Sequence, residues 1–139
     1  MGRRTYDGMV TYWTGPGVTE SPEIARRMTS LPKVVVSTTL TTPGWRNVRV
    51  VGEKVAEAIA AMKEAGGDGK DLAVFGSSTL TASLLTAGLV DEVRVIALPV
   101  VLGGGSTLLA GIDRRTTLEL VRSTTFRSGK LLVCYRPST

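Results

Sequence analysis

The sequence has no histidine and a single cysteine, and these two absences exclude several kinds of site. Zinc and iron sites are built largely from histidine and cysteine ligands, so the sequence predicts no metal centre. The one cysteine, Cys134, cannot form a disulfide within the chain, and such a thiol suits a reducing compartment. We therefore expect a cytoplasmic protein.

Aromatic residues and long apolar runs are also scarce. Only 5% of the residues are aromatic, and none interleave with a block of basic residues. This pattern argues against a nucleic-acid interface, although the net charge is +5. No apolar run is long enough to span a bilayer, so we expect no membrane partner. A compact phosphorylated cofactor fits scattered arginines as well, and an ordinary solvated surface accounts for most of them.

What the sequence does contain fits one globular domain over residues 1–139. Hydrophobic residues make up 42% of the chain and charged residues 21%, which are globular values. A chain of 139 residues is long enough to bury a core. Helical and strand patterns alternate before a final hairpin. This order predicts an α/β fold with crossover connections and an antiparallel edge.

The expected elements follow from apolar periodicity and from glycine and proline positions. The first helix begins at Gly2 and carries an apolar stripe that ends at Trp13, and Thr14–Gly17 is expected to be a loop. The other expected helices are a segment from Ser21 to about Leu31, Glu53–Ala65 and Thr79–Ala87, the last stopped by Gly88. The expected strands are Lys33–Ser37, Val48–Val51, Leu72–Phe75, Val93–Leu102, Thr117–Thr125 and Leu131–Arg136.

The functional argument centres on the stretch Leu72–Leu80. Its first half indicates a buried strand, and Gly76 permits a turn that a Cβ would hinder. Ser77 and Ser78 can cap the following helix, whose free N–H groups attract anions such as phosphate. An ordinary strand–turn–helix connection has the same pattern and is favoured for this stretch alone.

Arg3 and Arg4 stand at an expected helix start, where the helix dipole prefers acids. A bound anion would resolve that conflict, because arginine presents a planar donor fork to phosphate. Two exposed arginines without a role explain the pair equally well. The hydroxyl-rich loop Thr38–Gly44 could bind a sugar phosphate or simply satisfy its own turns. The triple glycine 103–105 admits a ligand or frees a loop, and the sequence slightly favours the loop.

Six short motifs recur in order along the chain. They are Met1–Tyr6, Leu31–Leu40, Trp45–Val48, Val74–Leu80, Gly88–Glu92 and Pro99–Gly105. Together they resemble the dihydrofolate-reductase-like superfamily, in the branch of the reductase domain of riboflavin biosynthesis. The resemblance implies a mixed, mostly parallel sheet flanked by helices, with a C-terminal antiparallel hairpin. It carries no information on the substrate.

The resemblance also implies NADPH binding across the carboxyl ends of the strands. The implied cofactor contacts are Gly2, Arg3, Arg4 and Thr5; Ser37, Thr38 and Thr39; and Phe75, Gly76, Ser77, Ser78, Thr79 and Leu80. Gly103 and Gly104 are the implied substrate contacts. The implied activity is that of an oxidoreductase, which transfers a hydride to a pterin-like, ribosyl-pyrimidine or other small carbonyl or imine substrate. A non-catalytic nucleotide-binding or interaction protein on the same scaffold is the alternative.

Members of this branch begin with a further strand and a loop bearing an S-x-D-G type motif, whereas this sequence starts at the next helix. In those members the loop often supplies an acidic residue that faces the substrate. No residue here can be assigned that role, since Asp7 and Asp91 are better explained as exposed helix or cap residues. A late gene start, a fragment and a gap covered by a partner are all open. A sheet without its central strand exposes unpaired backbone groups, so we expect the chain to be rearranged, self-associated or poorly stable.

The resemblance finally implies a homodimer that pairs through the C-terminal strands. The candidate apolar residues for that face are Leu118, Leu120, Leu131 and Val133. The same four residues could instead belong to the core.

Overall fold

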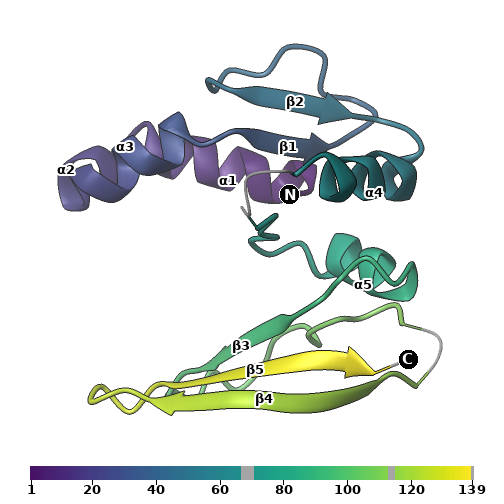
Figure 1. Cartoon of the computed structure of the whole chain (residues 1–139). Helices are drawn as coiled ribbons and strands as arrows, with labels where there is room; N and C mark the ends of the chain where they lie inside the picture. The colour runs from purple at the N-terminus through teal and green to yellow at the C-terminus, as the bar shows by residue number, and fades with distance from the viewer. Residues whose placement is uncertain (67–70, 113–114, 139) are drawn as a thin grey trace. The chain divides into compact units, whose positions relative to one another are not determined.

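The computed structural model describes residues 1–66, 71–112 and 115–138 (Figure 1). Contacts divide the chain into two compact units, Met1–Leu80 and Thr81–Thr139. Each unit has its own sheet, a parallel pair in the first and three antiparallel strands in the second. The α/β fold class and the C-terminal antiparallel hairpin are confirmed, with the strands divided between two sheets. The expectation of a single domain stays a prediction.

Unit 1 packs helices against a pair of parallel strands. Its elements are α1 (Arg3–Trp13), α2 (Pro16–Glu20), α3 (Pro22–Ser30), β1 (Lys33–Val36), β2 (Val48–Val51) and α4 (Val55–Ala65). Both α1 and α4 lie on the same side of the β1–β2 pair (Figure 1). The expected loop Thr14–Gly17 is wrong in its second half, where α2 begins. Proline at the first position of a short helix explains this, because its fixed φ suits the first turn.

The apolar stripe of α1 faces the core of unit 1, as its helical spacing predicts. Tyr6 is buried together with Val35 of β1 and Trp45 of the loop before β2. The rings of Tyr6 and Trp45 lie 6.5 Å apart between centroids. Met9 and other partly buried apolar side chains pack around this cluster. The core therefore fixes α1 against β1.

Lys33, the first residue of β1, is only 5% exposed. Its ammonium donates to the carbonyl oxygens of Met28, Thr29 and Leu31 at 2.8, 3.0 and 2.7 Å. It also lies 4.4 Å from the ring centroid of Trp45. The last turn of a helix leaves carbonyl groups without partners, and Lys33 satisfies those at the end of α3. Burial lowers the pKa of this ammonium.

Replacing Tyr6 with Phe is expected to leave the protein as stable as before, or up to about 1 kcal/mol more stable. The hydroxyl of Tyr6 is buried, and none of the described residues offers it a hydrogen-bond partner. Losing such a group removes a desolvation cost while the ring stays in place. Urea unfolding of both proteins measures the difference. A loss above about 1 kcal/mol would show that the hydroxyl is bonded in solution.

The expected buried strand Leu72–Phe75 is wrong. The structure gives this segment no strand, and Leu72 and Phe75 are 51% and 54% exposed. An apolar run indicates a strand only where neighbouring strands complete its hydrogen bonds. In the described chain, the β1–β2 pair has no third full strand.

Unit 2 contains the antiparallel sheet. It contains β3 (Val93–Ala97), β4 (Thr117–Thr125) and β5 (Leu131–Ser138), which lie in the order β3–β5–β4. It also includes most of α5 (Ser78–Thr86). The expected strand Val93–Leu102 is too long by its second half. Ala97 pairs with Leu131, the first residue of β5, so the residues after Ala97 find no partner on that strand.

Two glycines in unit 2 take the positions expected of them. Gly88 follows α5 with φ +70°, its N–H donates to the carbonyl of Leu85, and that of Leu89 donates to Leu84. This pair of bonds is the Schellman helix ending. Gly129, with φ +79°, turns the β4–β5 hairpin.

Register places the four candidate dimer residues on one face of the antiparallel sheet. Leu131 and Val133 alternate with Tyr135 along β5, and Leu120 of β4 pairs with Tyr135. Leu118 lies two residues before Leu120 and shares its face. Cys134 points to the opposite face and is fully buried.

Candidate functional site

Three segments far apart in the sequence meet at the start of α1. Gly2 forms a parallel bridge with Val36, the last residue of β1. A Cβ placed on Gly2 would lie 2.7 Å from Ser77 Oγ, and one placed on Gly76 would lie 3.9 Å from Thr5 Oγ1. The structure therefore brings the residues at the α1 start, the β1 end and the 76–77 turn to one place. We call this place the α1-start site.

The start of α1 has no cap of its own. Gly2 precedes the helix in extended geometry, makes no side-chain cap bond, and the first turn contains no acid. The first helical bond runs from the N–H of Tyr6 to the carbonyl of Gly2, at 3.0 Å. The amides of the preceding residues have no acceptor within the helix, and the helix dipole adds positive potential there. The site is therefore suited to an anion.

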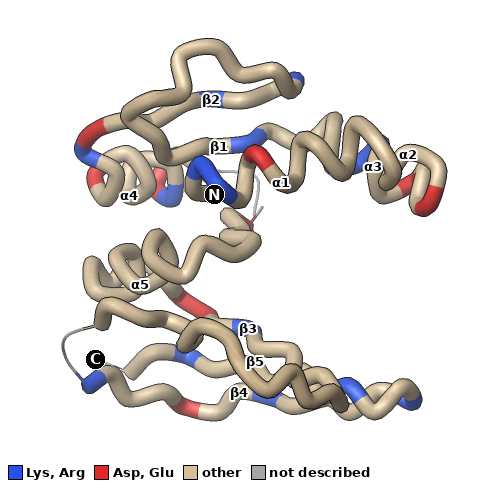
Figure 2. The backbone as a smooth tube through the Cα atoms, turned by 180° about the vertical axis from the view of Figure 1, so that it is seen from behind, with Lys and Arg blue, Asp and Glu red and all other residues tan. Residues whose placement is uncertain are grey.

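The two arginines of this turn behave differently. Arg3 Nε donates to both carboxylate oxygens of Asp7, at 2.9 and 3.0 Å. Their side chains are 41% and 52% exposed, so the pair contributes only a few tenths of a kcal/mol. Arg4 is exposed and has no hydrogen-bond or ion-pair partner in the described parts of the chain. In Figure 2 the basic start of α1 lies next to the N-terminus, followed by one acidic position.

Ser37 organises the loop that follows β1. Its Oγ accepts hydrogen bonds from the N–H groups of Thr39 and Leu40, at 3.2 and 3.1 Å. Thr38 and Thr39 are exposed. Gly52, directly after β2, lies beneath this loop, since a Cβ there would be 3.3 Å from the carbonyl oxygen of Ser37. Ser37 thus forms the hydrogen bonds within the turn that the sequence offered as one of two explanations. Thr38 and Thr39 are exposed and accessible to a ligand.

The 76–77 turn holds two consecutive left-handed residues. Gly76 has φ +70° and Ser77 has φ +68°, a region that strains a residue with a side chain by about 1 kcal/mol. Phe75 and Thr79 are exposed, whereas the side chain of Leu80 is only 9% exposed. Ser78 is exposed and begins α5. The accessible part of this motif is therefore the turn and the first residues of α5.

Gly103 and Gly104 belong to unit 2, in an exposed loop where Gly103 has φ +71°. Their assignment to substrate stays a prediction.

The part of the chain that the structure describes holds no group of three or more His, Cys, Asp or Glu residues arranged for a metal. No helix in that part is both long and apolar enough to cross a membrane.

Two contacts near the α1-start site were missed from the sequence: the pair of Asp7 with Arg3, and the approach of Gly52 to the loop after β1. Asp7 competes for Arg3, and the i,i+4 spacing of the two residues signals such a pair. Gly52 supports the loop after β1, and a glycine directly after a strand is a signal of close backbone approach.

A sequence model of the RibD C-terminal domain family matches residues 1–132. Among curated proteins, the uncharacterized protein YyaP of Bacillus subtilis (strain 168) is 33% identical over 85 residues. That alignment covers 61% of this chain and 44% of YyaP. The chain thus spans less than half the length of this relative.

Solved structures share the fold. A candidate riboflavin biosynthesis protein from Shewanella sp. PV-4 matches with a TM-score of 0.76 at 23% identity, over 100% of this chain and 72% of that chain. A pyrimidine reductase-like protein from Corynebacterium diphtheriae NCTC matches with a TM-score of 0.56 at 16% identity, over 86% and 54%. Acinetobacter baumannii RibD matches with a TM-score of 0.55 at 14% identity, over 76% and 36%.

Proposed function

The chain belongs to the RibD C-terminal domain family, and from this membership we propose that it is an NADPH-dependent reductase of a small carbonyl or imine substrate. The observation that carries the proposal is the α1-start site. An uncapped helix start, the unpaired Arg4 and the 76–77 turn converge there. The Corynebacterium diphtheriae structure is described as pyrimidine reductase-like, which supports a reductase chemistry. A pterin-like or ribosyl-pyrimidine substrate follows from the family resemblance alone.

The residues of the α1-start site fit a phosphorylated dinucleotide. The free amides of the first turn of α1 would hold a phosphate group, as uncapped helix starts do in many proteins. Arg4 would pair with the 2′-phosphate, since its guanidinium has no partner among the described residues. Gly76 has no Cβ and would let the diphosphate approach the backbone beside Thr5. Bound NADPH supplies the hydride, and the chain binds and orients it.

A second candidate is a nucleotide-binding protein that catalyses no reduction. One observation favours it. Among the described residues of the first helix, the only acid is Asp7, and its carboxylate already forms an ion pair with Arg3. No free carboxylate is therefore available there to assist proton transfer. Binding of NADPH without turnover, across a panel of pterin and carbonyl substrates, would support this candidate against the reductase.

Addition of NADPH tests the proposal directly. At a hundredfold excess of NADPH over its Kd, the folded state is expected to gain about 2.7 kcal/mol. Thermal unfolding with and without the cofactor measures this gain. If NADPH, NADH and flavin all leave the unfolding temperature unchanged, the proposal fails.

Arg4→Gln is expected to weaken NADPH binding about tenfold, or about 1.4 kcal/mol. Only NADPH carries the 2′-phosphate, so NADH binding should change little. Arg3→Gln should have a smaller effect, because Asp7 already neutralises Arg3. Arg27→Gln on α3, which breaks only an exposed pair with Glu23, is the matched control. Equal losses for NADPH and NADH would contradict the role given to Arg4.

The remaining partners follow the same proposal. We propose a small-molecule substrate, a cytoplasmic location and a homodimer that pairs through the C-terminal sheet. The shared face of Leu118, Leu120, Leu131 and Val133 supports the dimer, and Leu120 is 56% exposed.

A further inference from the structure

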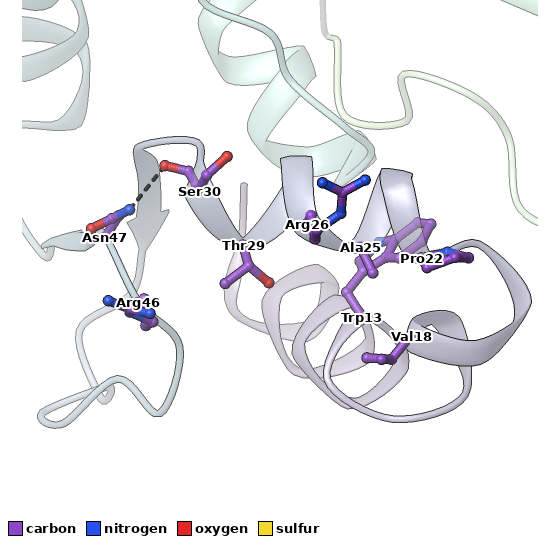
Figure 3. Close-up of a pocket in the computed structure, with 9 residues that line it drawn as sticks. All are labelled: Trp13, Val18, Pro22, Ala25, Arg26, Thr29, Ser30, Arg46 and Asn47. Atoms are coloured by element: carbon purple, nitrogen blue, oxygen red, sulfur yellow. Dashed lines mark hydrogen bonds between the residues drawn. The ribbon is translucent and has the colours of Figure 1, made fainter.

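A cavity lies within unit 1, at the far end of α1 from the α1-start site. It is open to solvent and has a volume of about 550 Å³, between the end of α1, the helices α2 and α3, and the residues that precede β2 (Figure 3). Ser30 and Asn47 line it, close to the amino ends of β1 and β2. The α1-start site is at the carboxyl end of β1, and the 11 residues of α1 span about 16 Å. The two sites therefore lie at opposite ends of the strand pair.

One wall of this cavity is apolar and held in place. Trp13 lines it, and its ring meets the ring of Tyr12 edge-on at 4.8 Å and 80°. Gly17 of α2 backs both rings, because a Cβ there would lie 2.8 Å from Trp13 Cε3 and 2.9 Å from Tyr12 Cε1. Val18 and the small, buried Ala25 complete the apolar lining. A fixed aromatic surface with a small neighbour is suited to a flat apolar group.

The opposite wall is polar and also fixed. Asn47 has φ +58°, and its side-chain amide donates to the carbonyl of Ser30 at 2.9 Å, the dashed line in Figure 3. The indole N–H of Trp45 donates to Thr29 Oγ1 at 3.3 Å. Arg46 lies between these two anchored residues and lines the cavity. Its backbone is therefore held from both sides.

The cavity has two cations and no acid among its described lining residues. Arg46 and Arg26 of α3 both line it, and neither has a hydrogen bond or ion pair within the described ranges. The acids of α2 and α3 are used elsewhere. Glu20 accepts a bond from the Tyr12 hydroxyl at 2.7 Å, and Glu23 pairs with Arg27 at 2.9 Å. Two unpaired guanidinium groups at one cavity favour an anionic ligand.

We propose that this cavity binds a small organic anion with a flat apolar body, such as an aromatic carboxylate. The ring would lie against Trp13 and the carboxylate would meet Arg26, while Arg46, which lies beside Asn47 on the other side of the cavity, would add positive potential (Figure 3). This site is separate from the α1-start site and does not depend on the proposed reductase activity.

The test compares 2-naphthoate with its neutral analogue 2-naphthamide, by isothermal titration calorimetry on the full chain. The acid is expected to bind saturably and about tenfold more tightly than the amide. Arg26→Gln should weaken the acid about fivefold and Arg46→Gln about twofold, and both should leave the amide unchanged. Arg27→Gln is the matched control on the same helix and should change neither. Saturating NADPH should also leave the affinity for 2-naphthoate unchanged.

Several outcomes would overturn the site. Absent or non-saturable binding of 2-naphthoate, or equal affinity for acid and amide, would show that the arginines select no anion. If Arg4→Gln weakens 2-naphthoate as much as Arg26→Gln does, the probe binds at the α1-start site instead. Arg26 and Arg46 are both exposed, so their variants should unfold at the temperature of the parent protein, which circular dichroism verifies.

Discussion

Lys33→Met is expected to lower the free energy of unfolding by about 2–4 kcal/mol. The buried ammonium is the donor for three carbonyl groups at the end of α3, at 2.7–3.0 Å. Methionine fills a similar volume but donates nothing, so those carbonyls lose their shared partner. The contact with the face of Trp45 is lost as well and adds to the cost. Urea unfolding followed by tryptophan fluorescence measures the effect.

Lys130→Met serves as the control for this variant. Lys130 is exposed at the β4–β5 turn, where its backbone carbonyl accepts from the N–H of Phe126, and its side chain has no hydrogen bond or ion pair to a described residue. Its replacement should change stability by less than about 0.5 kcal/mol. A comparably small effect at Lys33 would mean that water replaces the ammonium at the end of α3.

Gly2→Ala is expected to destabilise unit 1 by about 1 kcal/mol and to weaken NADPH stabilisation. The added Cβ would stand 2.7 Å from Ser77 Oγ, a contact that rotation of the serine side chain relieves, and 3.3 Å from Ser77 Cβ, so the 76–77 turn must shift by a few tenths of an ångström. Ser77 already has φ +68°, so a shift of its backbone adds to an existing strain. Thermal unfolding with and without NADPH reports both losses.

Two further variants make this prediction specific. Gly8→Ala, on the same helix with nothing within 4 Å of its Cβ, should stabilise the protein by about 0.5–1 kcal/mol. Ser77→Gly removes both clashing atoms and suits the left-handed backbone. Added to Gly2→Ala, it should therefore restore the stability of the protein and its stabilisation by NADPH. If the effects of the Gly2 and Ser77 changes simply add, the two residues are not in contact.

Local signals in the sequence predicted much of the fold. The stripe from Tyr6 to Trp13 gave the buried face of α1, and the β-branched run after Lys33 gave β1. Gly88 and Gly129 marked a helix end and a hairpin, because both need a left-handed backbone. Three of the candidate cofactor residues, Gly2, Gly76 and Ser77, lie close together beside the end of β1, and their role in binding a cofactor stays a prediction.

Features that depend on distant partners could not be predicted in this way. Leu72–Phe75 has the composition of a strand, yet no strand pairs with it in the described structure. The strand that begins at Val93 stops where β5 begins, a limit set 34 residues later along the chain, at Leu131. The same holds for Lys33, whose role at the end of α3 follows from burial, not from any pattern around it.

The positions of the tryptophans and of the thiol allow the unfolding of each half of the chain to be measured separately. Trp13 and Trp45 both lie in Met1–Leu80, whereas fully buried Cys134 lies in Thr81–Thr139. Fluorescence therefore follows melting of the first half, and alkylation of Cys134 follows opening of the second. Coincident denaturation midpoints for the two signals would mean a single cooperative folding unit, and separate midpoints would mean two.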